Sequence, residues 1–298
     1  DWVGSTTSVR GRAPEGITRL EDGQLLRDAI TRDPQAWLGP DHVARYGDDV
    51  MLLVKLLDAG QRLPVHAHPD GDFAASFVAA SHGKAEAWYI LTPGTVYLSL
   101  TQDLTVAELL SLVDTQDIAT LLSLMHEVTV DVGDCVFVPH GVLHAIGPGI
   151  LLAEVQEPED LSILLEWEGF DLDGRKDGHL DLGFELALSA VEATARSASN
   201  IESLIRRGVA DANALPDEAS PFFRLDKVDT QQSFPAGFGI VIALDAGADL
   251  IMDSGERHHL AAGSTTLLPY AAGPHTVEGS ALVARPPVPA DTATLQSG

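Results

Sequence analysis

Two segments carry the strongest structural signal in this sequence: Gly60–Asp70 (GQRLPVHAHPD) and Gly133–Gly147 (GDCVFVPHGVLHAIG). In the first, His66 and His68 are separated by one residue in a β-prone context, so a strand would project both imidazoles from one face. Two neutral ring nitrogens on one face can share a metal ion, although this spacing also arises in solvated pairs of surface histidines. The second segment places His144 shortly after a Pro-His-Gly turn.

A carboxylate lies between these two segments. In His82–Leu91 (HGKAEAWYIL), Glu86 begins an apolar run of strand length. A buried carboxylate without a partner is costly, and a metal cation is one partner that it could have. The sequence therefore offers three histidines and a glutamate as candidate ligands.

The pattern of short apolar runs predicts a mainly β protein. Runs rich in β-branched and aromatic residues alternate with Gly, Asp and Pro, which is typical of sandwiches or jelly rolls with helices as additions. Trp88–Leu91 and Thr95–Leu100 read as the two strands of a hairpin. Apolar residues recur at helical spacing in Thr101–His126, and Leu180–Gly208 is helical by composition. The tail Pro286–Gly298 is rich in Pro, Ala and Thr and is expected to be loose.

Length and charge limit the classes of function. The chain has 298 residues, 45% of them hydrophobic, which is enough for a sizeable core and suggests about two domains. Asp and Glu number 44 against 18 Lys and Arg, a net charge of −26 that argues against nucleic acid or an anionic membrane as partner. No apolar run approaches the roughly 18 residues of a membrane span. An anionic ligand would need nearby cationic side chains to offset the repulsion from this net negative charge.

The single cysteine limits the redox chemistry. Cys135 excludes an intrachain disulfide and a Cys-rich zinc site, and its strand-like surroundings predict a buried, inert thiol. No signal peptide is visible, so a cytoplasmic location is expected. Because the chain begins with Asp1 rather than Met, export stays open.

The two segments together resemble the cupin superfamily. Gly60-x5-His66-x-His68 has the spacing of the first cupin motif, and Gly133-x5-Pro139-x-Gly141-x2-His144 has that of the second. A typical cupin places its glutamate a few residues after the histidine pair, whereas Glu86 follows His68 by 18 residues. That gap resembles the type I phosphomannose isomerases. The similarity covers about residues 1–191 and is carried by Leu53–Asp70 (LVKLLDAGQRLPVHAHPD), Gly83–Ile90 (GKAEAWYI), Gly141–Pro158 (GVLHAIGPGILLAEVQEP) and Gly178–Ala187 (GHLDLGFELA).

This resemblance implies a fold of two cupin-type jelly-roll barrels with helical insertions. Residues 1–178 would form a metal-bearing N-terminal barrel with a helical insert. Residues 179–298 would form a helical connection and a degenerate, metal-free C-terminal barrel. The implied function is a metal-dependent aldose–ketose isomerase that converts mannose-6-phosphate to fructose-6-phosphate or acts on a related sugar, so its partner would be a small sugar or sugar phosphate.

The resemblance also implies roles for individual residues. The metal ligands would be His66, His68, Glu86 and His144, with His66 standing where the family usually has Gln. Three His and one carboxylate suit Zn²⁺ and would equally serve Fe²⁺, Mn²⁺, Co²⁺ or Ni²⁺. The residues that match or neighbour the sugar site are the lysines Lys55 and Lys84, the candidate base Glu154 and the candidate proton carrier His140.

One position departs from the family pattern. Leu164 stands where the family carries an arginine implicated in catalysis, and an apolar side chain cannot hold a phosphate or stabilise an oxyanion. Arg175 could reach in from the next loop, and Arg285 is a weaker candidate. Three alternatives follow: isomerisation of a different, unphosphorylated sugar, a non-catalytic sugar-binding or regulatory cupin, or an Fe²⁺ dioxygenase, which commonly uses the same donor set.

Overall fold

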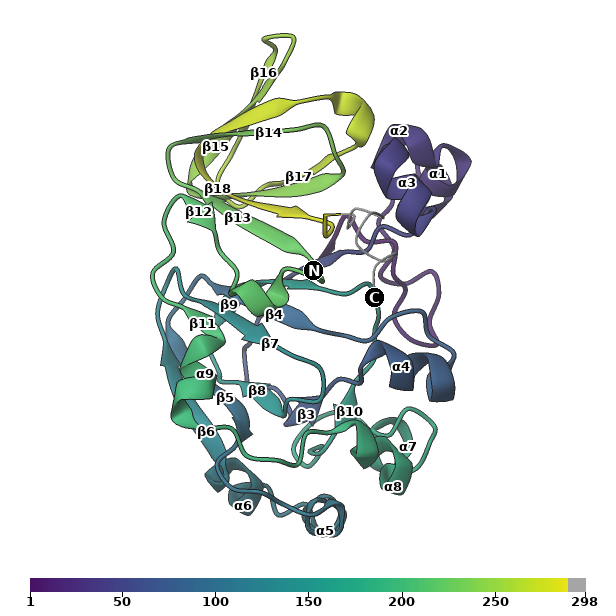
Figure 1. Cartoon of the computed structure of the whole chain (residues 1–298), viewed down its shortest axis with the longest axis vertical. Helices are drawn as coiled ribbons and strands as arrows, with labels where there is room; N and C mark the ends of the chain where they lie inside the picture. The colour runs from purple at the N-terminus through teal and green to yellow at the C-terminus, as the bar shows by residue number, and fades with distance from the viewer. Residues whose placement is uncertain (289–298) are drawn as a thin grey trace, which may run out of the picture.

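The computed structural model describes residues 1–288, so most of the tail expected to be loose, residues 289–298, lies outside the described residues. Within them the protein is mainly β, built from three antiparallel sheets, which confirms the predicted fold class. Two sheets face each other in the lower part of Figure 1, and the third forms the upper part. No described helix has the length and apolar character needed to cross a membrane.

The first two sheets form the N-terminal unit. Their strand orders are β1-β2-β9-β4-β7-β11 and β10-β3-β8-β5-β6. Apolar side chains from both fill the space between them, for example Trp88 and Val136 from one and Val96 and Ile146 from the other. The strands are β1 (Trp2–Val3), β2 (Leu53–Asp58), β3 (His66–Ala67), β4 (Glu86–Ile90), β5 (Gly94–Leu100), β6 (Met125–Val130), β7 (Cys135–Val138), β8 (His144–Ile146), β9 (Leu151–Gln156), β10 (Ile163–Leu164) and β11 (Ile205–Arg206).

The third sheet forms the C-terminal unit around two long strands that pair with each other. The register of this pair shifts between Ala243 and Ala248, where the chain passes close to Gly279. A side chain at Gly279 would lie 2.7 Å from the carbonyl oxygen of Gly247, and its φ of +112° also favours glycine. The strands are β12 (Ala212–Asn213), β13 (Arg224–Val228), β14 (Gln231–Phe234), β15 (Gly239–Met252), β16 (Arg257–Leu260), β17 (Thr265–Leu268) and β18 (His275–Arg285).

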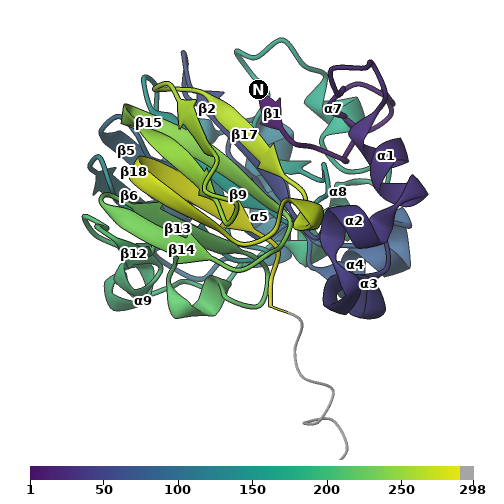
Figure 2. The same cartoon turned by 90° about the horizontal axis from the view of Figure 1, so that it is seen from above.

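Short helices surround the sheets. Figure 2 shows α1 to α3 beside the stacked strands. The helices predicted within Thr101–His126 are confirmed as α5 and α6, and Thr105 begins α5 with a capping box to Glu108. The α-helices are α1 (Leu26–Arg32), α2 (Pro34–Leu38), α3 (Pro40–Tyr46), α4 (Gly71–Phe73), α5 (Val106–Thr115), α6 (Ile118–Ser123), α7 (Gly174–Asp177), α8 (Phe184–Ala187) and α9 (Ala198–Ser203).

One prediction about secondary structure is wrong, and another is confirmed only in part. Trp88–Leu91 and Thr95–Leu100 do not form a hairpin: β4 pairs with β7 and β9, whereas β5 pairs with β6 and β8 in the facing sheet. The turn between them carries the chain from one sheet to the other. The helical prediction for Leu180–Gly208 is confirmed only in part: α8 and α9 lie within it and are joined by irregular chain, and the positive φ angles at Leu180, Asp181 and Gly183 keep a helix from beginning earlier.

The buried thiol is confirmed. Cys135 lies in β7 with no exposed surface, and burial raises its pKa to about 12. At neutral pH it stays a protonated thiol, which is a poor nucleophile and a poor metal ligand.

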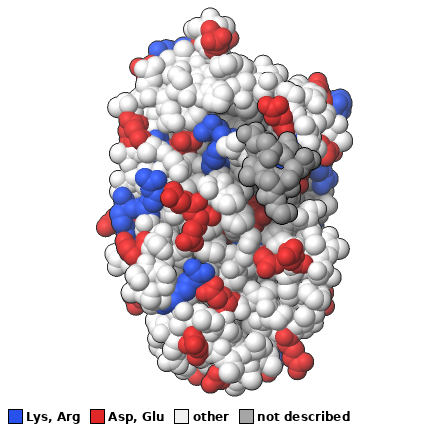
Figure 3. All heavy atoms as spheres, viewed as in Figure 1, with Lys and Arg blue, Asp and Glu red and all other residues white. Residues whose placement is uncertain are grey.

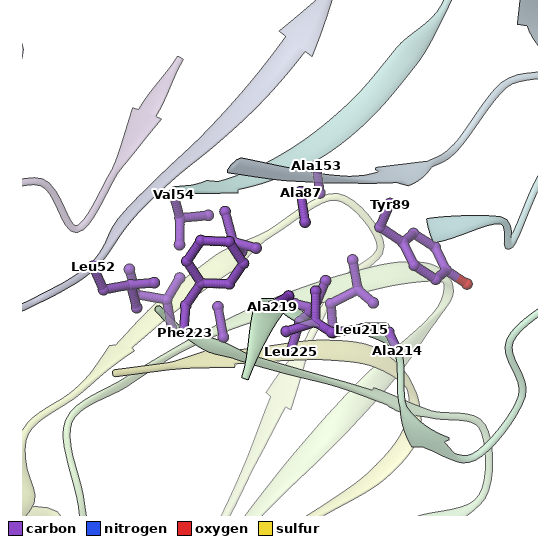
Figure 4. Close-up of a cluster of buried hydrophobic side chains, with 14 of the residues drawn as sticks. Leu52, Val54, Ala87, Tyr89, Ala153, Ala214, Leu215, Ala219, Phe223 and Leu225 are labelled. Carbon is purple, nitrogen blue, oxygen red and sulfur yellow. The ribbon is translucent and has the colours of Figure 1, made fainter. Parts of the chain in front are cut away.

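The two units share a core. Figure 4 shows Leu52 and Val54 of the first sheet facing Phe223 and Leu225 of the C-terminal unit. The division at residue 178 stays a prediction, and the next strand along the chain, β11, is hydrogen-bonded to β7 of the N-terminal unit. Figure 3 shows acidic and basic groups interspersed over one face rather than gathered in one patch.

We expect Phe223→Ala to destabilise the protein by about 3–5 kcal/mol, because the ring is fully buried where the two units meet. Urea unfolding measures this free energy. Val132→Ala is the control, since Val132 is 59% exposed and its truncation should change the free energy of unfolding by less than about 0.5 kcal/mol. Equal effects of the two substitutions would contradict a shared core.

Candidate metal centre

Three histidines meet between the two N-terminal sheets. His66 of β3 and His144 of β8 are directly paired residues, and His68 follows β3 by one position. Their candidate ligand nitrogens all lie within 4.8 Å of one another, and the rings of His66 and His144 are 4.0 Å apart. His68 and His144 are buried, whereas His66 is partly exposed.

Hydrogen bonds orient all three rings in the same way. Each Nδ1 lies within hydrogen-bond distance of a backbone carbonyl oxygen, which fixes the tautomer with the proton on Nδ1 and the lone pair on Nε2. The Nε2 atom of His144 is buried without a hydrogen bond. The carbonyls belong to Pro64 for His66 (2.8 Å), Leu161 for His68 (2.6 Å) and Val142 for His144 (2.8 Å).

Glu86 of β4 points at this group from the opposite sheet. Its Oε2 lies 3.1 Å from Nε2 of His68, and its Oε1 lies 3.3 Å from Nε2 of His144. The indole N–H of Trp88 donates to Oε1 at 2.9 Å and so orients the carboxylate. The structure therefore brings together the four residues named above as metal ligands.

The protonation of these groups fits a divalent cation. Burial lowers the pKa of His68 to about 3 and that of His66 well below its ordinary value. Burial raises the pKa of Glu86, but the charge of Lys84, with the hydrogen bonds that the carboxylate accepts, outweighs it and holds that pKa well below its ordinary range. At neutral pH the two histidines are therefore neutral and the glutamate is ionised, as metal binding requires.

A lysine shares the hydrogen-bonding atoms of this group. The buried Nζ of Lys84 lies 2.8 Å from Nε2 of His68 and 2.7 Å from Oε2 of Glu86. Burial favours the neutral amine, but the charges of Glu86 and Glu154 raise the pKa of Lys84 above its ordinary value. Because Lys84 uses atoms that would ligate a metal, metal binding requires it to give up these hydrogen bonds.

The second lysine and the candidate base form a pair on neighbouring strands. Lys55 of β2 and Glu154 of β9 are directly paired, with Nζ 3.2 Å from Oε1. The ammonium group of Lys55 also lies 4.8 Å from the centre of the Trp2 ring. Glu154 is in turn paired with Trp88 across β9 and β4. Glu154 is buried on the inner face of the sheet that carries Glu86.

The side chains of the remaining candidates make their described contacts with other residues. Nε2 of His140 donates to Oε2 of Glu157 at 2.5 Å, and the His140 ring lies edge-on to Phe222. The exposed Arg175 donates to the carbonyl oxygen of Asp114. Its described contacts do not reach the histidines. Arg285 belongs to the C-terminal unit, where it pairs with Asp226.

The position that lacks the family's arginine lies beside the site. Leu164 of β10 is directly paired with His66. Sequence reasoning missed Trp88 as a partner of Glu86, although residues two apart on a strand share a face. It also missed Trp2 and Glu157, for which contacts between distant segments leave no local signal.

The pair of His82 and Asp49 allows a prediction about how the stability of the protein depends on pH. Nε2 of His82 lies 2.6 Å from Oδ2 of Asp49. Burial lowers the pKa of His82, but the hydrogen bond and charge of Asp49 outweigh it and raise the pKa above its ordinary value. A raised histidine pKa means that the pair stabilises the fold at about pH 5.5 and that this contribution is lost as pH rises through the folded-state pKa.

We therefore expect His82→Gln to destabilise the protein at about pH 5.5 and to have little effect at about pH 9. The loss in free energy of unfolding at about pH 5.5 should stay below about 1 kcal/mol, because the Asp49 side chain is 34% exposed and water screens the pair. Urea unfolding of both proteins at the two pH values measures it. An equal difference at both would show that the charge of His82 does not stabilise the fold.

Comparison with known proteins agrees with this geometry. Residues 2–94 match the family model "Phosphomannose isomerase type I, catalytic domain". The chain is 27% identical over 273 residues to "Probable mannose-6-phosphate isomerase GmuF" of Bacillus subtilis, covering 89% of this chain and 83% of that one. It is 28% identical over 228 residues to mannose-6-phosphate isomerase of Streptococcus mutans, covering 73% and 68%.

A solved structure shares the fold. A mannose 6-phosphate isomerase bound with zinc and yttrium superposes with a TM-score of 0.66 at 16% identity, covering 89% of this chain and 86% of that one. The likeness therefore extends beyond residues 2–94 into the C-terminal unit. The segment 2–94 is therefore similar to the catalytic domain of type I phosphomannose isomerases, in agreement with the resemblance noted from the motifs.

Proposed function

We propose that the protein is a divalent-metal-dependent aldose–ketose isomerase that converts mannose-6-phosphate to fructose-6-phosphate. The observation that carries this proposal is the cluster of His66, His68, His144 and Glu86, with a buried lysine at its edge. The names of the relatives support the reaction class and the substrate.

Zinc is the proposed metal. Three imidazole nitrogens and one carboxylate oxygen suit Zn²⁺, and a structural neighbour is described as bound with zinc. When bound, the ion would polarise the carbonyl or hydroxyl oxygens of the sugar as a Lewis acid. His66, His68, Glu86 and His144 would hold it, with Trp88 orienting the glutamate.

The chain's own residues would move the proton. In the aldose-to-ketose direction, a base takes the proton from carbon 2 and returns it to carbon 1, while a proton passes between the two oxygens. Glu154 is the proposed base, since it is buried and lies beside Lys55. Lys55 and Lys84 would stabilise the negative charge of the enediolate. His140, held by Glu157, is a proposed proton carrier.

The phosphate group of the substrate requires a cationic partner in the protein. Leu164 cannot contact it as an arginine would, and Arg175 is engaged with Asp114. Arg10 is linked to the site through its backbone: its N–H donates at 2.9 Å to Asp160, a residue whose charge acts on Lys84, while its guanidinium lies 3.5 Å from the exposed Asp181. We propose Arg10 as the cation that meets the phosphate in this chain.

The test is a substrate panel with zinc-loaded protein and a chelated control. We expect ketose formation from mannose-6-phosphate that stops on chelation, and a higher KM in Arg10→Ala. Turnover of unphosphorylated mannose alone would overturn the assignment of a phosphate. If the protein binds metal and is stabilised by the sugar but shows no turnover, it is the non-catalytic sugar-binding protein that the loss of the arginine at Leu164 suggests. Oxygen consumption would indicate a dioxygenase.

A further inference from the structure

A cavity lies between the two units, and none of the residues proposed to carry out the reaction lines it. It has a volume of about 650 Å³ and lies between the first sheet, which contributes Leu56, Tyr89 and Leu151, and the C-terminal unit, which contributes Lys227 and Leu244. Cavities of a few hundred to about 1,000 Å³ are the usual size for sites that enclose a small molecule.

This cavity and the metal centre lie on opposite faces of one sheet. Side chains alternate along a strand, so Glu86 and Trp88 of β4 face the histidines while Tyr89 points the other way. The same alternation separates Lys55 from Leu56 on β2. A molecule in the cavity would therefore not contact the proposed metal ligands.

The walls combine apolar side chains with an almost equal share of polar surface. Leu56, Leu151 and Leu244 provide hydrocarbon surface. Figure 4 shows the hydroxyl of Tyr89 pointing away from the apolar side chains around it, and no described residue hydrogen-bonds to it. Burial raises the pKa of Tyr89 to about 12, so the phenol keeps its proton and can donate it. Ser280 adds a second hydroxyl.

The charges of the cavity disfavour an anion. Its one cation, the buried Lys227, donates to Asp229, to the carbonyl oxygen of Val228 at 2.9 Å and to the hydroxyl of Ser280 at 3.3 Å. These three acceptors match its three N–H groups. Asp245, exposed at the edge, brings the number of carboxylates to two against one ammonium.

We propose that this cavity, named here the interdomain cavity, binds an uncharged small molecule that has an apolar body and a hydroxyl or carbonyl group. The apolar body would lie against Leu56, Leu151 and Leu244, and the polar group would hydrogen-bond to Tyr89. This site is additional to the proposed isomerase site and does not depend on it.

Three probes with one body and different charges test the proposal: 2-naphthalenemethanol, 2-naphthaleneacetate and 2-naphthalenemethylamine. Calorimetric titration into the full chain should give saturable binding of the alcohol that is at least about 10-fold tighter than that of the acetate, because the cavity carries more carboxylates than free cations. The amine tests the other sign of charge, and tighter binding of the amine than of the alcohol would overturn the uncharged class.

Two variants place the binding in the interdomain cavity. Tyr89→Phe keeps the ring and should weaken binding of the alcohol by about 2- to 10-fold, the usual effect of losing one hydrogen bond. Leu244→Trp fills the space and should abolish binding. The control His144→Ala should leave the dissociation constant of the alcohol unchanged, whatever it does to isomerisation. No binding of the alcohol, or binding that persists in Leu244→Trp and disappears in His144→Ala, would overturn the proposal.

Discussion

In His144→Ala, bound metal and isomerase activity should disappear together. His144 is fully buried, its Nε2 has no hydrogen bond, and its Nδ1 is already held by a backbone carbonyl, so a metal is the partner its ring is prepared for. Removal of residues that merely orient metal ligands costs about 10- to 100-fold in affinity, so loss of a ligand should cost more than about 100-fold.

Inductively coupled plasma mass spectrometry measures the bound metal. The rate of ketose formation measures the activity. The matched control is His258→Ala in β16, where the side chain is half exposed and lies near Glu256. It should keep both the metal and the activity. A metal-free His144→Ala protein with full activity would refute the role of the metal.

Lys84→Met should separate activity from metal binding. Lys84 donates to Glu86 and lies within hydrogen-bond distance of His68, so its removal frees both of these proposed ligands. We therefore expect the metal to bind at least as tightly as in the parent protein. Turnover should fall by about 10²- to 10³-fold, because the cation proposed to stabilise the enediolate is lost.

The control for this variant is Lys176→Met, which removes an exposed lysine of α7. It should change neither the metal dissociation constant nor the turnover number. If Lys84→Met binds metal more weakly and keeps its turnover number, Lys84 is a structural partner of the ligands and not part of the reaction.

The cluster proposed as a metal centre was the most predictable part of the site. One residue between His66 and His68 on a strand fixes their shared face, and the spacing after Gly133 predicted His144 as a further ligand. Glu86 could be named because a carboxylate at the head of an apolar strand needs a partner. The contacts that orient these ligands, such as Trp88 and the carbonyl oxygen of Leu161, arise from the packing of facing sheets.

The errors have physical causes. The predicted hairpin of β4 and β5 failed because local pattern cannot distinguish a turn within a sheet from a passage between two sheets. The helical prediction for Leu180–Gly208 was only partly right, because irregular chain joins α8 and α9 and its apolar residues still pack against the N-terminal unit. The role of Arg175 stays a prediction: it was named because it follows Leu164 in sequence, and its described hydrogen bond goes to the carbonyl oxygen of Asp114.

The most direct test is a crystal structure of the zinc-loaded protein with data on both sides of the zinc absorption edge. The expected result is one strong anomalous peak within about 2.0–2.3 Å of Nε2 of His66, His68 and His144 and of a carboxylate oxygen of Glu86. Lys84 should have moved away from His68 and Glu86. A zinc-saturated crystal with no peak at these residues, and with Lys84 still hydrogen-bonded to both, would contradict the central claim that this group is a metal centre.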